Sequence, residues 1–355
     1  MTGPIDALVE RVDSALAGFL DARTASLAEV GKDLEPVAQA ARAFVLDGGK
    51  RLRPSFAYWG WRTVRAASAD DRALVTAAAS LELLHACALV HDDVMDASQL
   101  RRGRPAAHAA FAALHRASGW TGDPDVFGTA AAILLGDLLL SWADAMFTAA
   151  GLAAADLPRT RQVWDDMREL VMAGQYLDVL VQARGEFSAE DALRVAKFKT
   201  SKYTVEGPLH LGAAAAGASP EVFAVLSEYG LPLGEAFQLR DDVLGVFGDP
   251  SRTGKPAGDD LLEGKRTLLV ALAMGQASAA QAGLLRRYLG DRAMAADQVA
   301  ELRAVIVSTG ALDQVEHRIA LRADEARKSL RTDAVSDDAR AALDGLVTAA
   351  TERHT

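Results

Sequence analysis

The feature that most limits the fold of this chain is a succession of long apolar segments with helix-forming composition. These segments cover residues 73–94, 128–147, 161–181 and 189–217. Another begins at Ser219-Pro220, a favoured pair for the N-cap and first turn of a helix. Short runs that alternate apolar and polar residues between turns are scarce. Because the long segments are too apolar to lie on a surface, the sequence predicts an all-α helical bundle.

Length alone does not decide the number of domains. The chain has 355 residues, 50% of them hydrophobic, and a prior of ~150 residues per domain suggests roughly two domains. A single large helical domain fits equally well. No repeat or low-complexity linker separates two halves, so we predict one domain over residues 1–355. Gly and Pro cluster in three places that read as loops: 48–49, 120–124 and 248–258.

Charge and terminal sequence argue against several classes of protein. Lys and Arg number 38 and Asp and Glu 48, a net charge of −10 that disfavours general nucleic-acid binding. The single cysteine, Cys87, excludes a disulfide framework and a thiolate metal site within the chain. The first residues lack a secretory signal pattern, and uninterrupted apolar runs such as 130–135 are far shorter than the ~20 residues of a membrane span. We expect a cytoplasmic protein without a transmembrane segment.

Two of the six Asp-Asp pairs in the chain lie in apolar segments, where burial of an unpaired carboxylate is costly. Asp92-Asp93 and Asp241-Asp242 come late in apolar segments, whereas the other four pairs have surroundings typical of solvated charge. Asp96 follows Asp92 by four residues, so on a helix both carboxylates project from one face and repel unless a cation lies between them. The spacing favours Mg²⁺, which takes its remaining ligands from water and substrate phosphates. A helix end that enters a polar loop is the structural alternative.

Basic residues lie on both sides of the first aspartate motif. Arg-Arg-Gly-Arg-Pro at 101–105 follows it, and Gly-Gly-Lys-Arg-Leu-Arg-Pro at 48–54 lies upstream. Lys50 and Arg53 are three apart and can face the same anion on a helical turn. Such residues form either a surface salt-bridge patch or, together with a metal, a clamp on a diphosphate. The spacing of a Walker A loop is absent, which weakens a nucleotide interpretation.

A second acidic motif repeats this design later in the chain. Its polar residues are Gln238, Asp241 and Asp242, with Lys255 in the following Gly- and Pro-rich loop and Lys199-Thr200 in the preceding apolar segment. Two acidic motifs on different helices, each followed by basic residues, indicate two walls of one cavity that holds metal and phosphate. On separate surfaces they would be charge patches.

These motifs, in this order, resemble those of the trans-isoprenyl diphosphate synthases. The matching strings include the two basic clusters, Gly-Gln-Tyr-Leu-Asp at 174–178, Lys-Thr at 199–200 and Phe-Gln-Leu-Arg-Asp-Asp at 237–242, within about residues 40–270. The resemblance implies a single all-α domain, usually a homodimer, with a deep central cavity. It also implies Mg²⁺-dependent condensation of isopentenyl diphosphate with an allylic diphosphate (dimethylallyl, geranyl or farnesyl) to an all-trans polyprenyl diphosphate.

The resemblance further implies roles for individual residues. Asp92, Asp96 and Asp241 would hold the metal. The other contacts of the allylic diphosphate would be Arg101, Lys199, Thr200, Gln238 and Lys255, and those of isopentenyl diphosphate would be Lys50, Arg53, His85 and Arg102. The metal ligands, Arg101 and Lys199 would be catalytic, because they stabilise the departing pyrophosphate while the isopentenyl double bond attacks the allylic cation. Gln175 and Asp178 would orient metal-bound water or a lysine.

One position departs from the family pattern. The second motif usually ends in aspartate, but here it reads Asp-Asp-Val-Leu-Gly at 241–245. Because Asp241 is the better-placed ligand and Asp242 remains, we expect weakened or altered allylic binding at most.

Product length should follow the depth of the cavity. Cys87 and Ala88, five and four residues before Asp92, would lie beneath the reacting end of the growing chain, and their small side chains pass the stopping role to Leu84 and its neighbours. This favours geranylgeranyl diphosphate as the product, with farnesyl or longer (C25 and above) products as alternatives. A class I terpene cyclase and a non-catalytic partner subunit are the rival classes. Residues after about 275 receive no chemical role.

Overall fold

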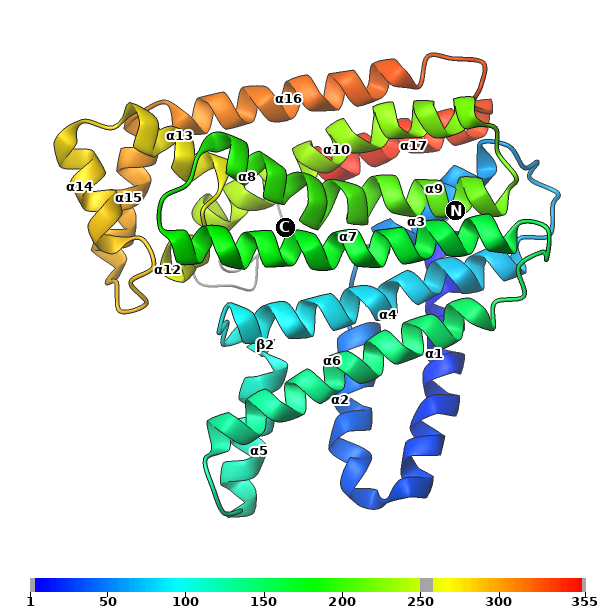
Figure 1. Cartoon of the computed structure of the whole chain (residues 1–355), viewed down its shortest axis with the longest axis horizontal. Helices are drawn as coiled ribbons and strands as arrows, with labels where there is room; N and C mark the ends of the chain where they lie inside the picture. The colour runs from blue at the N-terminus through cyan, green and yellow to red at the C-terminus, as the bar shows by residue number, and fades with distance from the viewer. Residues whose placement is uncertain (1–3, 250–257, 353–355) are drawn as a thin grey trace. The chain divides into compact units, whose positions relative to one another are not determined.

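The regular structure of this chain is almost wholly helical. The computed structural model describes residues 4–249 and 258–352, in which the strands β1 (Leu100–Arg101) and β2 (Arg104–Pro105) form one short antiparallel hairpin. The prediction of an all-α fold is confirmed (Figure 1). Contacts along the chain define two compact units: unit 1 is Met1–Thr160 with Leu211–Ala218, and unit 2 is Arg161–His210 with Ser219–Thr355. The single domain over 1–355 stays a prediction.

Unit 1 is built around one apolar helix, α4 (Arg72–Met95), which packs against α6, α3 and α1. The other helical elements of this unit are α1 (Pro4–Val30), η1 (Lys32–Leu34), α2 (Glu35–Leu46), α3 (Leu52–Arg62), α5 (Ala107–Ser118) and α6 (Pro124–Thr148). Most of α4 is buried because its residues are apolar on nearly all faces, as in the core helix of a bundle. Its C-terminal turn carries the first aspartate motif, in which Asp93 and Asp96 are buried.

Local signals set the helix boundaries in unit 1. Asp123 caps α6 by accepting a 2.8 Å hydrogen bond from the backbone N–H of Asp125, and Pro124 occupies the first turn. Gly119 ends α5 with a left-handed backbone (φ 63°). α6 approaches α4 closely at Gly136, where a Cβ would lie 2.0 Å from Nε2 of His91. The helix that carries the aspartates, α4, is therefore closely packed against α6.

Unit 2 surrounds the long helix α10 (Pro220–Phe247), which packs against η2 and α16. Its other helical elements are α7 (Leu157–Arg184), α8 (Ala189–Val195), η2 (Ala196–Glu206), α9 (Gly207–Ala215), α12 (Asp259–Glu263), α13 (Leu268–Gln276), α14 (Ala279–Tyr288), α15 (Ala296–Ser308), α16 (Ala311–Ser329) and α17 (Asp337–Thr351). The unit boundaries fall within two of these helices, so residues 157–160 of α7 and 211–215 of α9 belong to unit 1. Fully buried Leu239, Val246, Leu269, Leu302 and Ile306 belong to the core of this unit.

The segment predicted as one helix over 189–217 contains a π-helix, η2, of eleven residues. Two glycines on neighbouring helices explain how this wider helix packs. A Cβ on Gly174 of α7 would lie 2.4 Å from the backbone N of Lys199, and one on Gly234 of α10 would lie 2.4 Å from Cα of Ser201. Because π-helical turns are concentrated at functional sites, their coincidence with Lys199 and Thr200 marks this stretch for attention.

Within residues 4–249 and 258–352, two helices are long and apolar enough to span a membrane by length and composition alone. They are α4 and α6, and 72% and 39% of their apolar windows are buried. Both helices are apolar over a longer stretch than their uninterrupted apolar runs, because isolated charged residues interrupt those runs. Burial of α4 is what a core helix shows, and the absence of a transmembrane segment stays a prediction.

Candidate active site

The first aspartate motif occupies the last turn of α4. The backbone N–H of Asp96 donates to the carbonyl of Asp92 at 2.8 Å, so helical geometry persists to Asp96 and the two side chains share a face. Asp92 is half-buried and Asp96 is buried. Ala97, with a left-handed φ of 48°, ends the helix. Asp92 and Asp96 therefore lie one turn apart on the same face of α4, as their spacing predicts.

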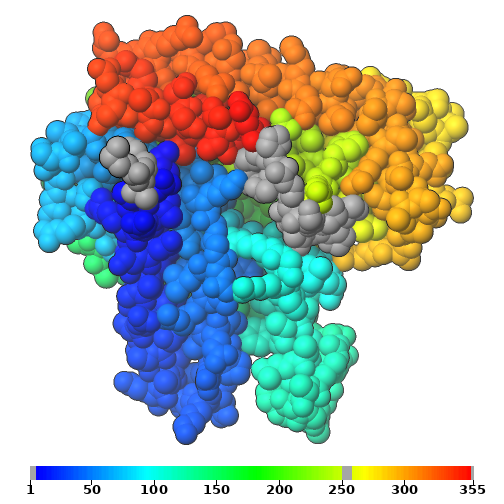
Figure 2. Space-filling view, turned by 180° about the vertical axis from the view of Figure 1, so that it is seen from behind, coloured from blue at the N-terminus to red at the C-terminus, as the bar shows by residue number. Residues whose placement is uncertain are grey.

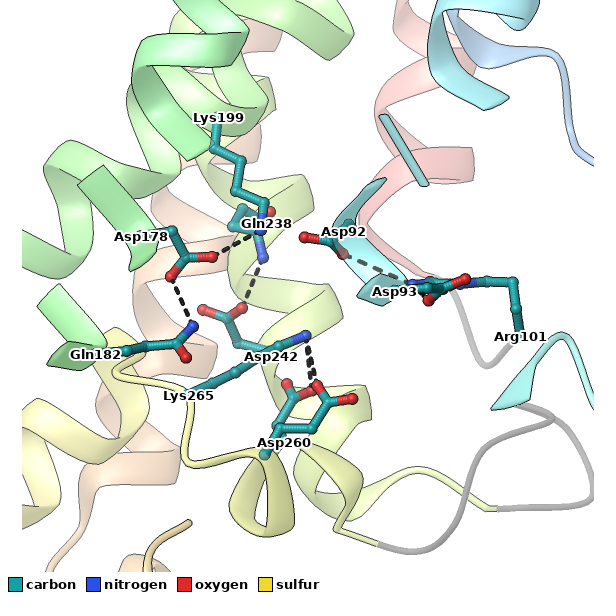
Figure 3. Close-up of polar contacts among 11 residues, drawn as sticks. Asp92, Asp93, Arg101, Asp178, Gln182, Lys199, Gln238, Asp242, Asp260 and Lys265 are labelled. Atoms are coloured by element: carbon teal, nitrogen blue, oxygen red, sulfur yellow. Dashed lines mark hydrogen bonds and ion pairs between the residues drawn. The ribbon is translucent and has the colours of Figure 1, made fainter. Parts of the chain in front are cut away.

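Arg101 is held beside this motif by a carboxylate to which the sequence assigned no role. Its Nε donates to Oδ1 and Oδ2 of Asp93 at 2.9 and 3.2 Å, and its Nη2 lies 3.6 Å from Oδ2 of Asp92 (Figure 3). The Asp93 side chain is fully buried. The β1–β2 hairpin brings Arg101 back to α4. An arginine expected to bind phosphate is thus already oriented by a buried partner.

His85 lies among the basic residues predicted for the isopentenyl diphosphate pocket. Its pKa is lowered well below the usual value, first by burial and then by the charges of Arg53 and Arg102. The imidazole is consequently neutral near pH 7. Arg53 is half-buried, Arg102 is exposed and donates to the carbonyl of Asp47 at 3.1 Å, and Lys50 is exposed. Unit 1 therefore brings His85, Arg53 and Arg102 into one electrostatic cluster.

Arg51 is the buried arginine of the upstream basic cluster, and its place in the sequence predicts no role for it. Its Nε donates to Asp13 at 2.7 Å, its Nη1 to Glu82 at 2.9 Å and its Nη2 to the carbonyl of Val45 at 2.9 Å. It has a left-handed backbone (φ 49°), which is uncommon for a residue with a side chain. A buried ion pair and an uncommon conformation together fix the loop that precedes α3.

The residues predicted to govern chain length lie along α4. Leu84 and Cys87 are buried, and Ala88 is half-buried. The Sγ of Cys87 lies 3.8 Å from Nδ1 of His91, and burial raises the pKa of this thiol to about 12. A thiol kept neutral in this way is a poor nucleophile.

In unit 2, Lys199 of η2 is ion-paired with Asp178 of α7, Nζ to Oδ2 at 2.7 Å (Figure 3). Asp178 also lies 3.4 Å from the side-chain amide of Gln182 one turn further along. Lys199 is one of the predicted phosphate contacts, and Asp178 was expected to orient a lysine. The structure contains this lysine–aspartate contact.

A chain of polar side chains connects η2 with the second aspartate motif. Thr200 donates to Oε1 of Gln238. In turn, Nε2 of Gln238 donates to Oδ1 of Asp242 at 2.7 Å (Figure 3). Burial, and then the nearby charge of Asp260, raise the pKa of Asp242 to about 8. Asp241, the predicted metal ligand, is half-buried. Lys255 lies outside the described residues.

Magnesium suits the donor set of each acidic motif. Within 4–249 and 258–352, no group of three or more His, Cys, Asp or Glu side chains is arranged to hold a metal ion by itself. Mg²⁺ is commonly bound by one or two carboxylates and completes its shell with waters and substrate phosphates. Asp92 and Asp96, and separately Asp241, offer hard oxygen donors of this kind. They therefore fit a metal that arrives with a diphosphate rather than one held in a protein cage.

An all-α fold with aspartates late in its apolar helices, beside basic side chains, defines the isoprenoid synthase class of proteins. Residues 35–306 match the family model described as Polyprenyl synthetase, which is most of the chain. The chain belongs to the polyprenyl synthetase family and is a trans-prenyltransferase.

Relatives and solved structures agree with this assignment. The chain is 34% identical over 310 residues to a geranylfarnesyl diphosphate synthase of Aeropyrum pernix, covering 86% of this chain and 91% of that protein. It is 34% identical over 262 residues to a geranylgeranyl diphosphate synthase of Mycobacterium tuberculosis, covering 74% and 69%. A crystal structure of geranylgeranyl pyrophosphate synthase from Corynebacterium glutamicum, complexed with isoprenyl diphosphate and magnesium, superposes with a TM-score of 0.95 at 43% identity, covering 99% and 100%.

Proposed function

We propose that this chain condenses isopentenyl diphosphate with an allylic diphosphate and releases geranylgeranyl diphosphate. The observation that carries the proposal is the similarity, over nearly its whole length, to a geranylgeranyl pyrophosphate synthase solved with isoprenyl diphosphate and magnesium. In the reaction the allylic carbon–oxygen bond breaks, the isopentenyl double bond forms the new carbon–carbon bond, and a proton leaves the adduct, with the released pyrophosphate as its acceptor.

The allylic diphosphate is bound, in this proposal, by residues of both acidic motifs. Asp92, Asp96 and Asp241 would hold Mg²⁺, which would supply positive charge to stabilise the departing diphosphate. Arg101, Lys199, Thr200, Gln238 and Lys255 supply the remaining contacts. This proposal is supported by the hydrogen bonds and ion pairs that orient these side chains within each unit. Asp93 orients Arg101, Asp178 orients Lys199, and Gln238 is held between Thr200 and Asp242.

Isopentenyl diphosphate is bound by Lys50, Arg53, His85 and Arg102. A neutral His85 beside two arginines can donate one hydrogen bond to the diphosphate without adding another positive charge to the cluster. Arg51 is too deeply buried, and too fully engaged with Glu82 and Asp13, to join them. It serves instead to hold the loop that carries the neighbouring Lys50 and Arg53.

Incubation of the purified chain alone with labelled isopentenyl diphosphate, an allylic diphosphate and Mg²⁺ tests this function. The expected result is a labelled C20 diphosphate, identified by chromatography after removal of the phosphates. A cyclised hydrocarbon formed without incorporation of label would indicate a terpene cyclase. Absence of product until another synthase is added would indicate a non-catalytic partner subunit.

Replacing Ala88 by Phe is expected to shorten the product from C20 to C15 or less. Ala88 lies one turn before Asp92 on α4, so an aromatic ring there would fill the path of the growing chain. Product lengths are measured by thin-layer or liquid chromatography at equal conversion. Cys87→Phe should act in the same direction, whereas Leu89→Phe, at a half-buried position one residue further round the helix, serves as the control. An unchanged product distribution in both test variants would refute the depth argument.

We further propose a cytoplasmic homodimer without a transmembrane segment. The apolar helix α6 supports a protein interface, because Val126, Ile133 and Leu134 are 66%, 43% and 67% exposed. Large apolar side chains gathered on one helix are typical of a surface that a partner covers. A second copy of the chain would account for this face of α6 without a membrane.

A further inference from the structure

Gly245, where the second aspartate motif lacks its last carboxylate, adjoins another carboxylate in space. A Cβ built on Gly245 of α10 would lie 2.0 Å from Oδ2, 2.3 Å from Cγ and 2.8 Å from Oδ1 of Asp260. The backbone around Gly245 is helical, so a glycine is not required there by an unusual φ. The space that a side chain at 245 would use is therefore filled by the carboxyl group of Asp260.

Asp260 is built into this place by the helix that follows the second motif. It is the second residue of α12, which packs against α10, and it is only 8% exposed. The Nζ of Lys265 lies 3.5 Å from its Oδ1, and the backbone N–H of Lys265 donates to its carbonyl at 2.9 Å. Figure 3 shows Asp260 beside Asp242, with Lys265 directed at it. The expectation of solvated charge at this Asp-Asp pair is therefore wrong for Asp260, whose carboxylate is buried and held in a defined position.

Position 245 is also the position that would complete the acidic face of α10. It lies four residues after Asp241 and three after Asp242, so all three project to neighbouring parts of the helix surface. The carboxylate of Asp260 thus lies against the face of α10 that carries Asp241, the predicted metal ligand. The chain of hydrogen bonds from Thr200 through Gln238 to Asp242 ends beside the same group.

We infer that Asp260 replaces, from α12, the carboxylate that the second aspartate motif lacks at Gly245, and that it positions the metal-bound allylic diphosphate. The inference rests on the proposed function and adds a residue to it. Glycine at position 245 then leaves the space that the carboxyl group of Asp260 occupies. From the sequence alone, Gly245 is expected to weaken allylic binding. In this arrangement we expect instead that an aspartate introduced at position 245 weakens allylic binding.

Four variants test the inference: Asp260→Asn, Asp260→Gly, Gly245→Asp and the double variant Gly245→Asp/Asp260→Gly. Removal of the Asp260 charge should raise the KM for the allylic diphosphate and the half-saturating Mg²⁺ concentration about tenfold, as for other groups that orient metal ligands. The KM for isopentenyl diphosphate should stay within about twofold. Gly245→Asp alone should also raise the KM for the allylic diphosphate and the half-saturating Mg²⁺ concentration, because its side chain overlaps Asp260. The double variant should recover most of the loss seen in Asp260→Gly.

A second readout is independent of turnover. Mg²⁺ with inorganic pyrophosphate should raise the melting temperature of the native protein, and raise it less in Asp260→Asn, relative to each protein without additions. Asp259→Asn, on the same helix, is the matched control and should behave as the native chain. If Asp260 had only a structural role, Asp260→Asn would lower the melting temperature of the protein without additions. The rise caused by Mg²⁺ and pyrophosphate would be unchanged, and the KM for the allylic diphosphate would not change relative to that for isopentenyl diphosphate.

The outcomes separate this inference from the proposed function. If the native chain forms no prenyl product, the proposed function fails. If it does, and Asp260→Asn leaves the allylic KM and the Mg²⁺ requirement within twofold of the native values, the role of Asp260 is wrong. The inference also fails if Gly245→Asp improves activity, or if the double variant is no better than Asp260→Gly.

Discussion

The Asp92→Asn variant is expected to lose about 10²- to 10³-fold in kcat, the size of effect seen when one preorganised electrostatic contact is removed from an active site. Asn keeps the shape of the side chain but removes the charge that Mg²⁺ requires. Asp92 is half-buried in the last turn of α4, so the substitution disturbs little packing. The rate is measured with saturating isopentenyl and allylic diphosphates over a range of Mg²⁺ concentrations, and higher Mg²⁺ should recover part of the loss.

Asp166→Asn provides the matched control for this experiment. Asp166 also belongs to an Asp-Asp pair on a helix, but it is exposed and accepts a hydrogen bond from Gln162 one turn earlier. Its kcat should match that of the native protein. If Asp92→Asn keeps more than about a third of the native kcat, a threefold change of less than ~1 kcal/mol, Asp92 is not a metal ligand.

Spacing along the chain predicted the parts of the site that depend on one helix. The apolar run before Asp92 predicted α4 within a residue at each end, and the four-residue spacing to Asp96 placed both carboxylates on one face. Helical periodicity carries this information because neighbours on a helix surface are neighbours in sequence. The resemblance implied that Asp178 orients metal-bound water or a lysine, and the structure identifies Lys199 as its ion-pair partner.

Contacts between distant segments could not be predicted in this way. Asp93 is only 8 residues before Arg101, but the sequence does not show that the hairpin turns the guanidinium back onto this carboxylate. The π-helix around Lys199 depends on glycines of two other helices, so the segment read as an ordinary helix. The sequence revealed the missing carboxylate at Gly245, but its neighbour Asp260 lies on a separate helix. In each case the decisive partner is brought in by tertiary packing.

Arg51 is the strongest example, and its replacement should have the largest effect on stability. Arg51→Ala is expected to lower the free energy of unfolding by about 3–5 kcal/mol, the usual cost of breaking a buried ion pair by removing one partner. The side chains of Arg51 and Glu82 are only 3% and 6% exposed, so Glu82 would be left buried without its cation. The partners lie 31 and 38 residues away in sequence. Urea denaturation of native and variant proteins measures the difference.

Two further variants show whether the buried pair is the cause. Arg72→Ala removes an arginine whose ion pair with Asp70 is exposed on both sides (86% and 63%), and such pairs contribute about 0–1 kcal/mol. Replacing Arg51 and Glu82 together by Met should cost less than Arg51→Ala alone, because no uncompensated charge remains in the core. The loop before α3 should loosen in Arg51→Ala, which raises the KM for isopentenyl diphosphate through Lys50 and Arg53. A loss below ~1 kcal/mol in Arg51→Ala, equal to that of Arg72→Ala, would show that solvent reaches Glu82 and that the loop is held by other contacts.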